Sequence, residues 1–185
     1  AYSSGHALQS SLIQRVSVST DSEKYARIAR QYGAEVPFLR PEIYAQDDSL
    51  DIDVFRHVLT ELEQTEGYIP DAVVHLRPTY PIRKVQDIDR MIQLLAKKKA
   101  DSVRCIAPAK ETAYKMWRAH SDGTISPVLC DIKEAYNMPR QALPQLYYQN
   151  ACIDVIRTEV ITKGHSMSGK KIIGYIMEDN FDIDT

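Results

Sequence analysis

Ala72-Val73-Val74-His75-Leu76 is a continuous apolar run, which is typical of a strand buried on both faces of a parallel sheet. In the stretch Lys84–Lys98, apolar residues recur at every third or fourth position and predict a helix. Ser102–Ile106 follows as a further strand. A strand, a helix and a strand in this order connect parallel strands. The sequence therefore predicts an α/β fold with a mostly parallel sheet and helices on both of its faces.

The N-terminal part continues this alternation of helices and strands. Asp21 or Ser22 is placed to cap a helix that Gly33 ends. Asp48 and Ser49 precede an amphipathic segment, so sequence alone assigns them the role of a helix cap. The predicted elements are a helix at the N-terminus, a strand over Arg15–Asp21, a helix over Glu23–Tyr32, an extended run over Val36–Leu39 and a helix over Ile52–Thr65.

After Pro108 the alternation breaks, and we expect an insertion over about 108–147 that leaves the sheet and returns to it. Within it, Ser121-Asp122-Gly123 lies between two extended runs and indicates a hairpin. We expect a single domain over residues 1–185, with sequence missing at both ends. The remaining predicted elements are a strand over Tyr147–Ile156, a short helix over Thr158–Lys163 and a strand over Lys171–Met177.

Composition excludes several classes of function. The 185 residues carry a net charge of −2, whereas proteins that bind nucleic acid through its phosphates usually have a basic excess. No apolar run approaches the roughly 18 residues of a membrane span, so we expect no membrane segment. The three cysteines, Cys105, Cys130 and Cys152, are widely spaced and favour a reducing cytoplasm over a disulfide framework.

Asp182 and Asp184 are the strongest candidates for metal ligands in the sequence. If their segment is extended, residues two apart share a face, and both carboxylates point the same way. Neighbouring carboxylates repel each other unless a cation lies between them, and oxygen ligands favour Mg²⁺ or Mn²⁺. The alternative that spacing leaves open is a solvated acidic strand end.

Two loops offer cationic groups for an anionic ligand. Arg77-Pro78-Thr79-Tyr80-Pro81-Ile82-Arg83 follows the buried strand, at the edge where ligands collect in α/β sheets, and its alternative is a rigid connection with surface arginines. Residues 164–171 nearly match a phosphate-binding loop, but the last position is Lys171 and a strand pattern follows it. We therefore expect a glycine-containing surface loop there.

Six segments, in order, resemble the CMP-sialic acid synthetases, also called acylneuraminate cytidylyltransferases. The resemblance runs along nearly the whole chain. The segments are Val18-Ser19-Thr20-Asp21-Ser22, Leu39-Arg40-Pro41 with Asp47 downstream, Leu76–Arg83, Pro139-Arg140-Gln141-Ala142-Leu143-Pro144-Gln145, Asn150-Ala151-Cys152-Ile153 and Phe181-Asp182-Ile183-Asp184-Thr185.

This resemblance implies a Rossmann-like nucleotidyltransferase that joins CMP from CTP to a nonulosonic 2-keto sugar acid and releases pyrophosphate. It makes Asp182 and Asp184 the catalytic ligands of Mg²⁺ or Mn²⁺. Arg40, Asp47 and Ser49 are expected to bind the nucleotide, and Arg77, Arg140, Tyr148, Asn150 and Asp154 the sugar acid. The inserted segment implies a homodimer in which it reaches the partner's sugar pocket. We expect the aspartates and the guanidinium groups at 40, 77 and 140 to line one crevice.

The chain also departs from the family pattern. Arg77 stands in place of Gln, Gln149 in place of Pro and Asp154 in place of an aromatic residue, all on the sugar side. A related sugar acid such as legionaminate or pseudaminate is therefore expected as an alternative to N-acetylneuraminate. The family's glycine-rich triphosphate loop would precede residue 1, so we expect this chain alone to be inactive and an intact parent active. The competing interpretations are a CMP-Kdo synthetase and a non-catalytic binding domain of the same fold.

Overall fold

The computed structural model describes residues 1–177, and a mixed four-stranded sheet forms the centre of the body. The strands are β1 (Ala72–His75), β2 (Ser102–Pro108), β5 (Tyr147–Arg157) and β6 (Ile172–Ile176), in the order β1-β5-β2-β6. β2 and β6 are parallel, whereas β5 runs antiparallel to both β1 and β2. The chain leaves the sheet at the end of β2 and returns there, so β5 must run back beside β2.

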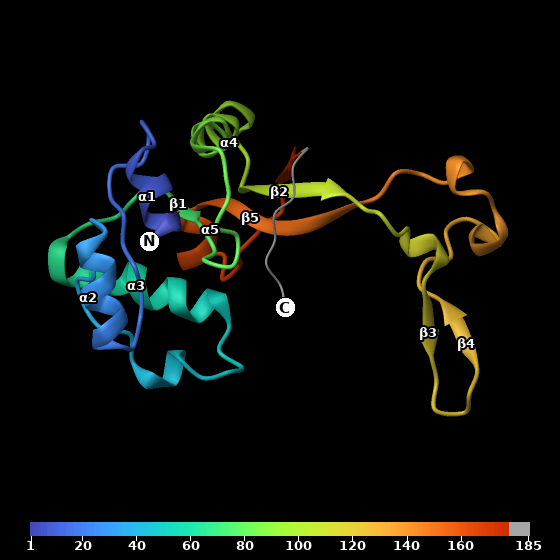
Figure 1. The fold of residues 1–185 in the computed structure, drawn as a ribbon, viewed down its shortest axis with the longest axis horizontal. Helices are drawn as coiled ribbons and strands as arrows, with labels where there is room; N and C mark the ends of the chain where they lie inside the picture. The colour runs from blue at the N-terminus through green and yellow to red at the C-terminus, as the bar shows by residue number, and fades with distance from the viewer. Residues whose placement is uncertain (178–185) are drawn as a thin grey trace.

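Helices cover both faces of this sheet, as the sequence predicts (Figure 1). On one face, α4 (Val85–Lys98) places Ile88 and Met91 against Ile153 and the other apolar residues of the main core. On the opposite face, α3 (Asp51–Glu66) and α5 (Thr158–Thr162) pack around Ile156. Since side chains alternate along a strand, Asp154 lies on the same face as Ile156, toward α3.

The N-terminal part folds against the body as short elements. The predicted helices are present as α1 (Tyr2–Leu8) and α2 (Glu23–Gln31), and Ser22 caps α2 by accepting a hydrogen bond from the Tyr25 N–H at 3.4 Å. The predicted strand over Arg15–Asp21 is wrong as a strand, because within residues 1–177 it forms a single parallel bridge, from Ser17 to Glu35. Its Val16 and Val18 pack on the small alanine cluster of α2 instead of joining the central sheet.

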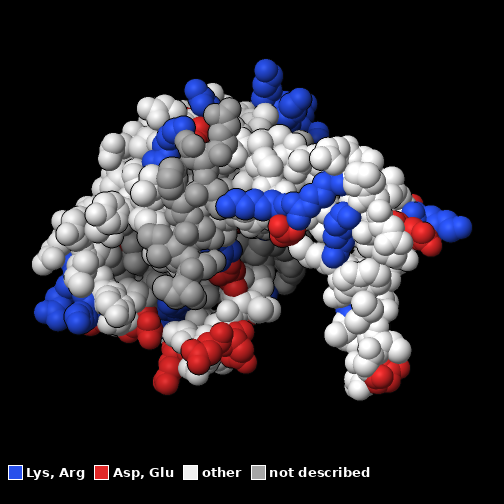
Figure 2. Space-filling view, turned by 45° about the vertical axis from the view of Figure 1, so that its right-hand side comes forward, with Lys and Arg blue, Asp and Glu red and all other residues white. Residues whose placement is uncertain are grey.

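The inserted segment forms an arm that projects from the body (Figure 1). The arm contains η2 (Ala113–Lys115), the hairpin strands β3 (Trp117–Ala119) and β4 (Ile125–Pro127), η3 (Ala135–Asn137) and η4 (Arg140–Ala142). A hydrogen bond from the Ala109 N–H to the Leu146 carbonyl, at 2.9 Å, closes its base. Figure 2 shows the arm standing beyond the body, with basic and acidic side chains mixed over the face in view.

Candidate functional site

A row of three polar residues crosses the central strands on the face that α3 covers. Asp154 of β5 lies opposite His75 of β1 on one side and opposite Arg104 of β2 on the other. Residues that are direct partners across strands have their side chains about 5 Å apart on the same face. The row therefore brings a carboxylate, an imidazole and a guanidinium together in the middle of the sheet.

Two further polar residues complete what we call the Asp154 cluster: His75, Arg77, Arg104, Gln149 and Asp154. The Gln149 amide joins two members, because its Oε1 accepts from Arg104 at 2.8 Å and its Nε2 donates to Asp154 Oδ2 at 3.3 Å. Arg77 donates to Asp51 Oδ2, at the first residue of α3, at 2.8 Å. Sequence reasoning identified Arg77 and Asp154 as site residues and placed Gln149 on the sugar side, but it missed His75 and Arg104, although a His or an Arg inside a buried strand was a usable signal.

The electrostatics of the Asp154 cluster follow from burial. Asp154 is 3% exposed, and this desolvation raises its pKa above the ordinary value although Arg104 and Arg77 act in the opposite direction. Burial also lowers the pKa of His75, to about 4, and the positive charge of Arg77 adds to the effect. The imidazole is therefore neutral near pH 7, and Asp154 pays a free-energy penalty for its charge.

His75 makes the stability of the fold depend on pH in a predictable direction. Its folded pKa of about 4 lies below the ordinary 6.5, so the unfolded chain binds the proton more readily. The contribution of neutral His75 to the free energy of unfolding is fully present above pH 6.5. It is lost as the pH falls toward about 4, and the loss amounts to about 3 kcal/mol.

Urea unfolding at several pH values would test this, because a His75→Gln variant is expected to lose less stability than the wild type over that window. Asp154, whose pKa is raised, changes stability in the opposite direction and is present in both proteins, so the comparison isolates His75. Parallel stability curves for the two proteins would contradict the assignment.

Arg40, one of the expected nucleotide residues, lies where the structure brings two separate segments of the chain together. The Arg40 N–H donates to the Thr20 carbonyl at 2.8 Å, which joins two of the segments on which the resemblance rests. Ser19 Oγ and Arg40 Nε are buried without a hydrogen-bond partner among residues 1–177. Buried polar atoms are normally paired, so this pair of atoms favours a ligand at the junction.

Capping of α3 by Asp48 or Ser49 is a prediction that the structure contradicts. The N-cap of α3 is Leu50, and no side chain among residues 1–177 caps it. The Ser49 hydroxyl accepts from the Gln46 N–H at 2.9 Å, so it stabilises the preceding turn. Asp47 is exposed in the same turn.

The remaining sugar-site candidates on β5 differ in exposure. Asn150 is 1% exposed, and its Nδ2 donates to Met177 Sδ at 3.5 Å while its Oδ1 accepts from the Cys152 N–H. The intervening Ala151 has a φ of 56°, which accompanies the irregular pairing of β5 with β2. Tyr148, by contrast, is 39% exposed opposite Ala107, near the base of the arm.

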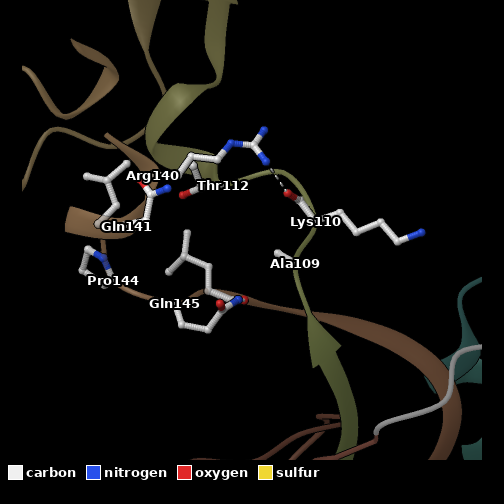
Figure 3. A pocket seen from close by; sticks show the side chains of 9 residues that line it. Ala109, Lys110, Thr112, Arg140, Gln141, Pro144 and Gln145 are labelled. Atoms are coloured by element: carbon white, nitrogen blue, oxygen red, sulfur yellow. Dashed lines mark hydrogen bonds between the residues drawn. The ribbon is translucent and has the colours of Figure 1, made fainter. Parts of the chain in front are cut away.

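Arg140 lies on the arm, beside a pocket of about 450 Å³ (Figure 3). Its Nη1 donates to the Lys110 carbonyl at 3.0 Å, and its Nη2 pairs with Glu111. The pocket is lined by Ala109, Lys110, Thr112, Arg140, Gln141, Leu143, Pro144, Gln145 and Leu146. All of these residues belong to the arm, so the expectation that Arg140 shares one crevice with Arg77 is wrong within a single chain.

In the loop that nearly matches a phosphate-binding motif, backbone N–H groups donate to side chains of the protein itself. Asp101 Oδ2 accepts hydrogen bonds from the N–H groups of Lys170 and Lys171 at 2.7 and 2.8 Å. Ser166 Oγ accepts from the N–H groups of Ser168 and Gly169, and strand β6 follows. The expectation of a surface loop is thus confirmed, because the amides that a phosphate would need are already bonded.

The expected metal ligands, Asp182 and Asp184, lie outside the described residues. Among residues 1–177, no group of three or more His, Cys, Asp or Glu side chains is arranged to hold a metal ion. Within the same range, no helix is both long and apolar enough to cross a membrane.

Comparison with known proteins gives the family. A family described as Cytidylyltransferase matches residues 1–162. The chain belongs to this family. Its likeness to the CMP-sialic acid synthetases, drawn above from six sequence segments, is thereby confirmed.

Two relatives of this cytidylyltransferase match along the whole chain. Post-translational flagellin modification protein B of Campylobacter coli is 29% identical over 100% of the chain and 78% of its own length. CMP-N,N'-diacetyllegionaminic acid synthase of Campylobacter jejuni is 27% identical with the same coverage. A solved structure of CMP:2-keto-3-deoxy-manno-octonic acid synthetase, complexed with CTP, has a TM-score of 0.65 at 13% identity over 98% of this chain and 80% of that one, which supports the Rossmann-like fold.

Proposed function

We propose that this cytidylyltransferase joins CMP from CTP to a nonulosonic sugar acid and releases pyrophosphate. The observation that carries the proposal is the match of the whole chain to a relative named for the synthesis of CMP-N,N'-diacetyllegionaminic acid. The departures at residues 77, 149 and 154 support a sugar acid other than N-acetylneuraminate itself. Likeness to the octonic acid synthetase rests on fold alone, so it gives weaker support to that substrate.

The chemistry that this function requires is positioning and charge neutralisation. The anomeric hydroxyl oxygen attacks the α-phosphorus, the bond to the β-phosphate oxygen breaks, and the hydroxyl proton is released. Arg40, whose buried Nε has no hydrogen-bond partner among residues 1–177, is suited to hold the nucleotide phosphates. Arg77, at the carboxyl end of β1, is suited to the acidic group of the sugar.

We assign Asp182 and Asp184 as the residues that hold a divalent cation. Two carboxylates with one residue between them provide the hard oxygen donors that Mg²⁺ prefers, with Mn²⁺ as a second candidate. When bound, the metal would neutralise phosphate charge. This donor set fits the cation, and the described residues offer no competing group.

We further propose a homodimer in which each arm completes the partner's sugar site. The proposal rests on the placement of Arg140 in a pocket lined by arm residues, whereas Asp154 and its partners His75 and Arg104 lie on strands of the central sheet. In a dimer, the partner's arm would bring its pocket to the Asp154 cluster of this chain. The three cysteines are unpaired, which agrees with the cytoplasmic setting that we propose.

Pyrophosphate release by the full-length protein tests the proposed reaction. The protein would be given CTP and Mg²⁺ with N,N'-diacetyllegionaminic acid, N-acetylneuraminic acid or 2-keto-3-deoxy-manno-octonic acid. We expect pyrophosphate and a CMP-sugar with at least one of the two nonulosonic acids, and slower turnover with the octonic acid. A preference for the octonic acid would favour the alternative substrate, and no turnover with any of the three would favour a binding domain.

A further inference from the structure

The imidazole of His57, on α3, lies between two aromatic rings. The Phe38 ring meets it edge-on, with the ring centroids 5.4 Å apart and the planes at 86° to each other. The Tyr44 ring is tilted against it, with the centroids 5.2 Å apart. Both separations are those of favourable aromatic contacts. We call these three side chains the His57 ring cluster, and the His57 side chain within it is 11% exposed.

Hydrogen bonding does not explain how the imidazole is held. Its Nδ1 is buried and has no hydrogen-bond partner among residues 1–177. Its Nε2 lies 4.0 Å from Glu61 Oε1, one turn further along α3, which is beyond hydrogen-bond distance. A phenyl ring would pack in the same place without burying an unpaired nitrogen. The use of the His57 side chain in this fold is therefore to pack against the segment that carries the two rings.

The two rings flank Arg40 in the sequence. Phe38 precedes Arg40 by two residues, and Tyr44, the last residue of η1 (Glu42–Tyr44), follows it by four. Between the two rings, Arg40 is partly buried, and the residues at 39 and 41–43 are exposed. One side chain of α3 thus contacts this segment at both of its ends.

The position of the Arg40 side chain depends on the backbone of this segment. The Arg40 N–H donates to the Thr20 carbonyl at 2.8 Å, which fixes the segment near its middle. Arg40 Nε is buried without a hydrogen-bond partner among residues 1–177, so no bond at that atom orients the guanidinium within this range. A binding group that is held in place before the ligand arrives loses less freedom on binding. Contacts at both ends of the segment provide such a restraint.

We propose that His57 is a positioning residue for Arg40. By packing against Phe38 and Tyr44, it holds the backbone between them in the conformation that presents the Arg40 guanidinium to the phosphates of CTP. This inference rests on the proposed function, because it concerns how the nucleotide side of that site is supported. Without the imidazole the segment can move, and CTP must then order it on binding, which weakens the affinity.

A double-mutant cycle on CTP binding tests this coupling in the full-length protein. Titration calorimetry with CTP and Mg²⁺, without a sugar acid, measures the Kd. We expect Arg40→Ala to raise the Kd about 30-fold and His57→Ala about tenfold. Because His57 acts through Arg40, the double variant should bind CTP as Arg40→Ala does, within about twofold. His57→Phe restores the ring contacts, so it should keep the wild-type Kd within about twofold and should not lower the thermal midpoint.

The control for lost stability is Leu62→Ala, which removes a buried side chain from the same helix. It should lower the thermal midpoint and leave the Kd for CTP unchanged. If His57→Ala does not fold, Phe38→Ala and Tyr44→Ala take its place in the cycle, and each should raise the Kd about threefold.

The possible outcomes separate this inference from the proposed function. A wild type that binds CTP while His57→Ala or Arg40→Ala binds it equally well refutes the inference alone. So do effects that multiply in the double variant, a Kd for His57→Phe as high as that of His57→Ala, or an equal rise in Leu62→Ala. If the wild type binds no CTP, the proposed function fails, and the positioning role fails with it.

Discussion

Asp184→Ala is expected to reduce CMP-sugar formation by at least about 100-fold, because the loss of a metal ligand removes several kcal/mol of charge stabilisation. Asp182→Ala should have an effect of the same order, because the two carboxylates are proposed to hold one cation. The loss should appear in kcat, and raising the Mg²⁺ concentration should restore part of it in either single variant. Pyrophosphate release at saturating CTP and sugar acid measures both quantities.

The control for this prediction is a carboxylate with no proposed role. Asp71→Asn lies on the exposed approach to β1 and should retain the wild-type rate at every Mg²⁺ concentration. Full activity of Asp184→Ala, or a loss that appears equally in Asp71→Asn, would remove the metal assignment. Circular dichroism of each variant would show whether the fold is intact.

Arg140→Ala is expected to raise the KM for the sugar acid by about 100-fold, because a charged hydrogen bond to an anionic substrate is lost. The KM for CTP should stay near its wild-type value. Arg140 lies in the arm pocket and Arg77 in the body, so the effect also tests whether the arm belongs to a sugar site at all. Elsewhere on the arm, Lys115 Nζ donates to the Tyr136 carbonyl. Lys115→Ala removes that bond and therefore serves as a control for altered arm structure.

Mixed dimers would show whether the arm acts on its own chain or on the partner. Arg140→Ala and Asp184→Ala chains would be co-expressed with different tags, purified through both, and assayed at a sugar-acid concentration well below the KM of Arg140→Ala, at which each variant alone is expected to be strongly impaired. If the arm crosses, each mixed dimer has one site with both defects and one intact site, and activity should approach roughly half that of the wild type. If the arm serves its own chain, every site carries one defect and the mixed dimers stay strongly impaired.

The elements of this fold followed from local patterns, and the site did not. The periodicity of Lys84–Lys98 and the apolar run from Ala72 predicted α4 and β1 to within a residue or two. The strand predicted at Arg15–Asp21 was wrong because alternation alone cannot show whether a partner strand is available. Asp184 and Asp182 were named from their spacing, but they lie outside the described residues.

The sequence could not show which residues of β5 pair with which residues of β2, the two strands that the arm connects. Arg104 and Asp154 are direct partners, yet the whole arm separates them in the chain. Nothing local to either residue specifies that pairing, since it depends on where β5 re-enters the sheet. The separation of Arg140 from Arg77 was missed for the same reason, because the direction in which an insertion projects is set by tertiary packing.

The closed base of the arm makes the insertion separable from the rest of the architecture. One backbone hydrogen bond, from Ala109 to Leu146, ties the outgoing and incoming chains together where β2 and β5 are already paired. Lengthening or shortening the segment beyond that point changes loop-closure entropy slowly and leaves the pairing of the strands untouched. Evolution can therefore reshape the projecting module, and with it the choice of acceptor, at little cost to the catalytic scaffold, and a designer could exchange such modules between homologues.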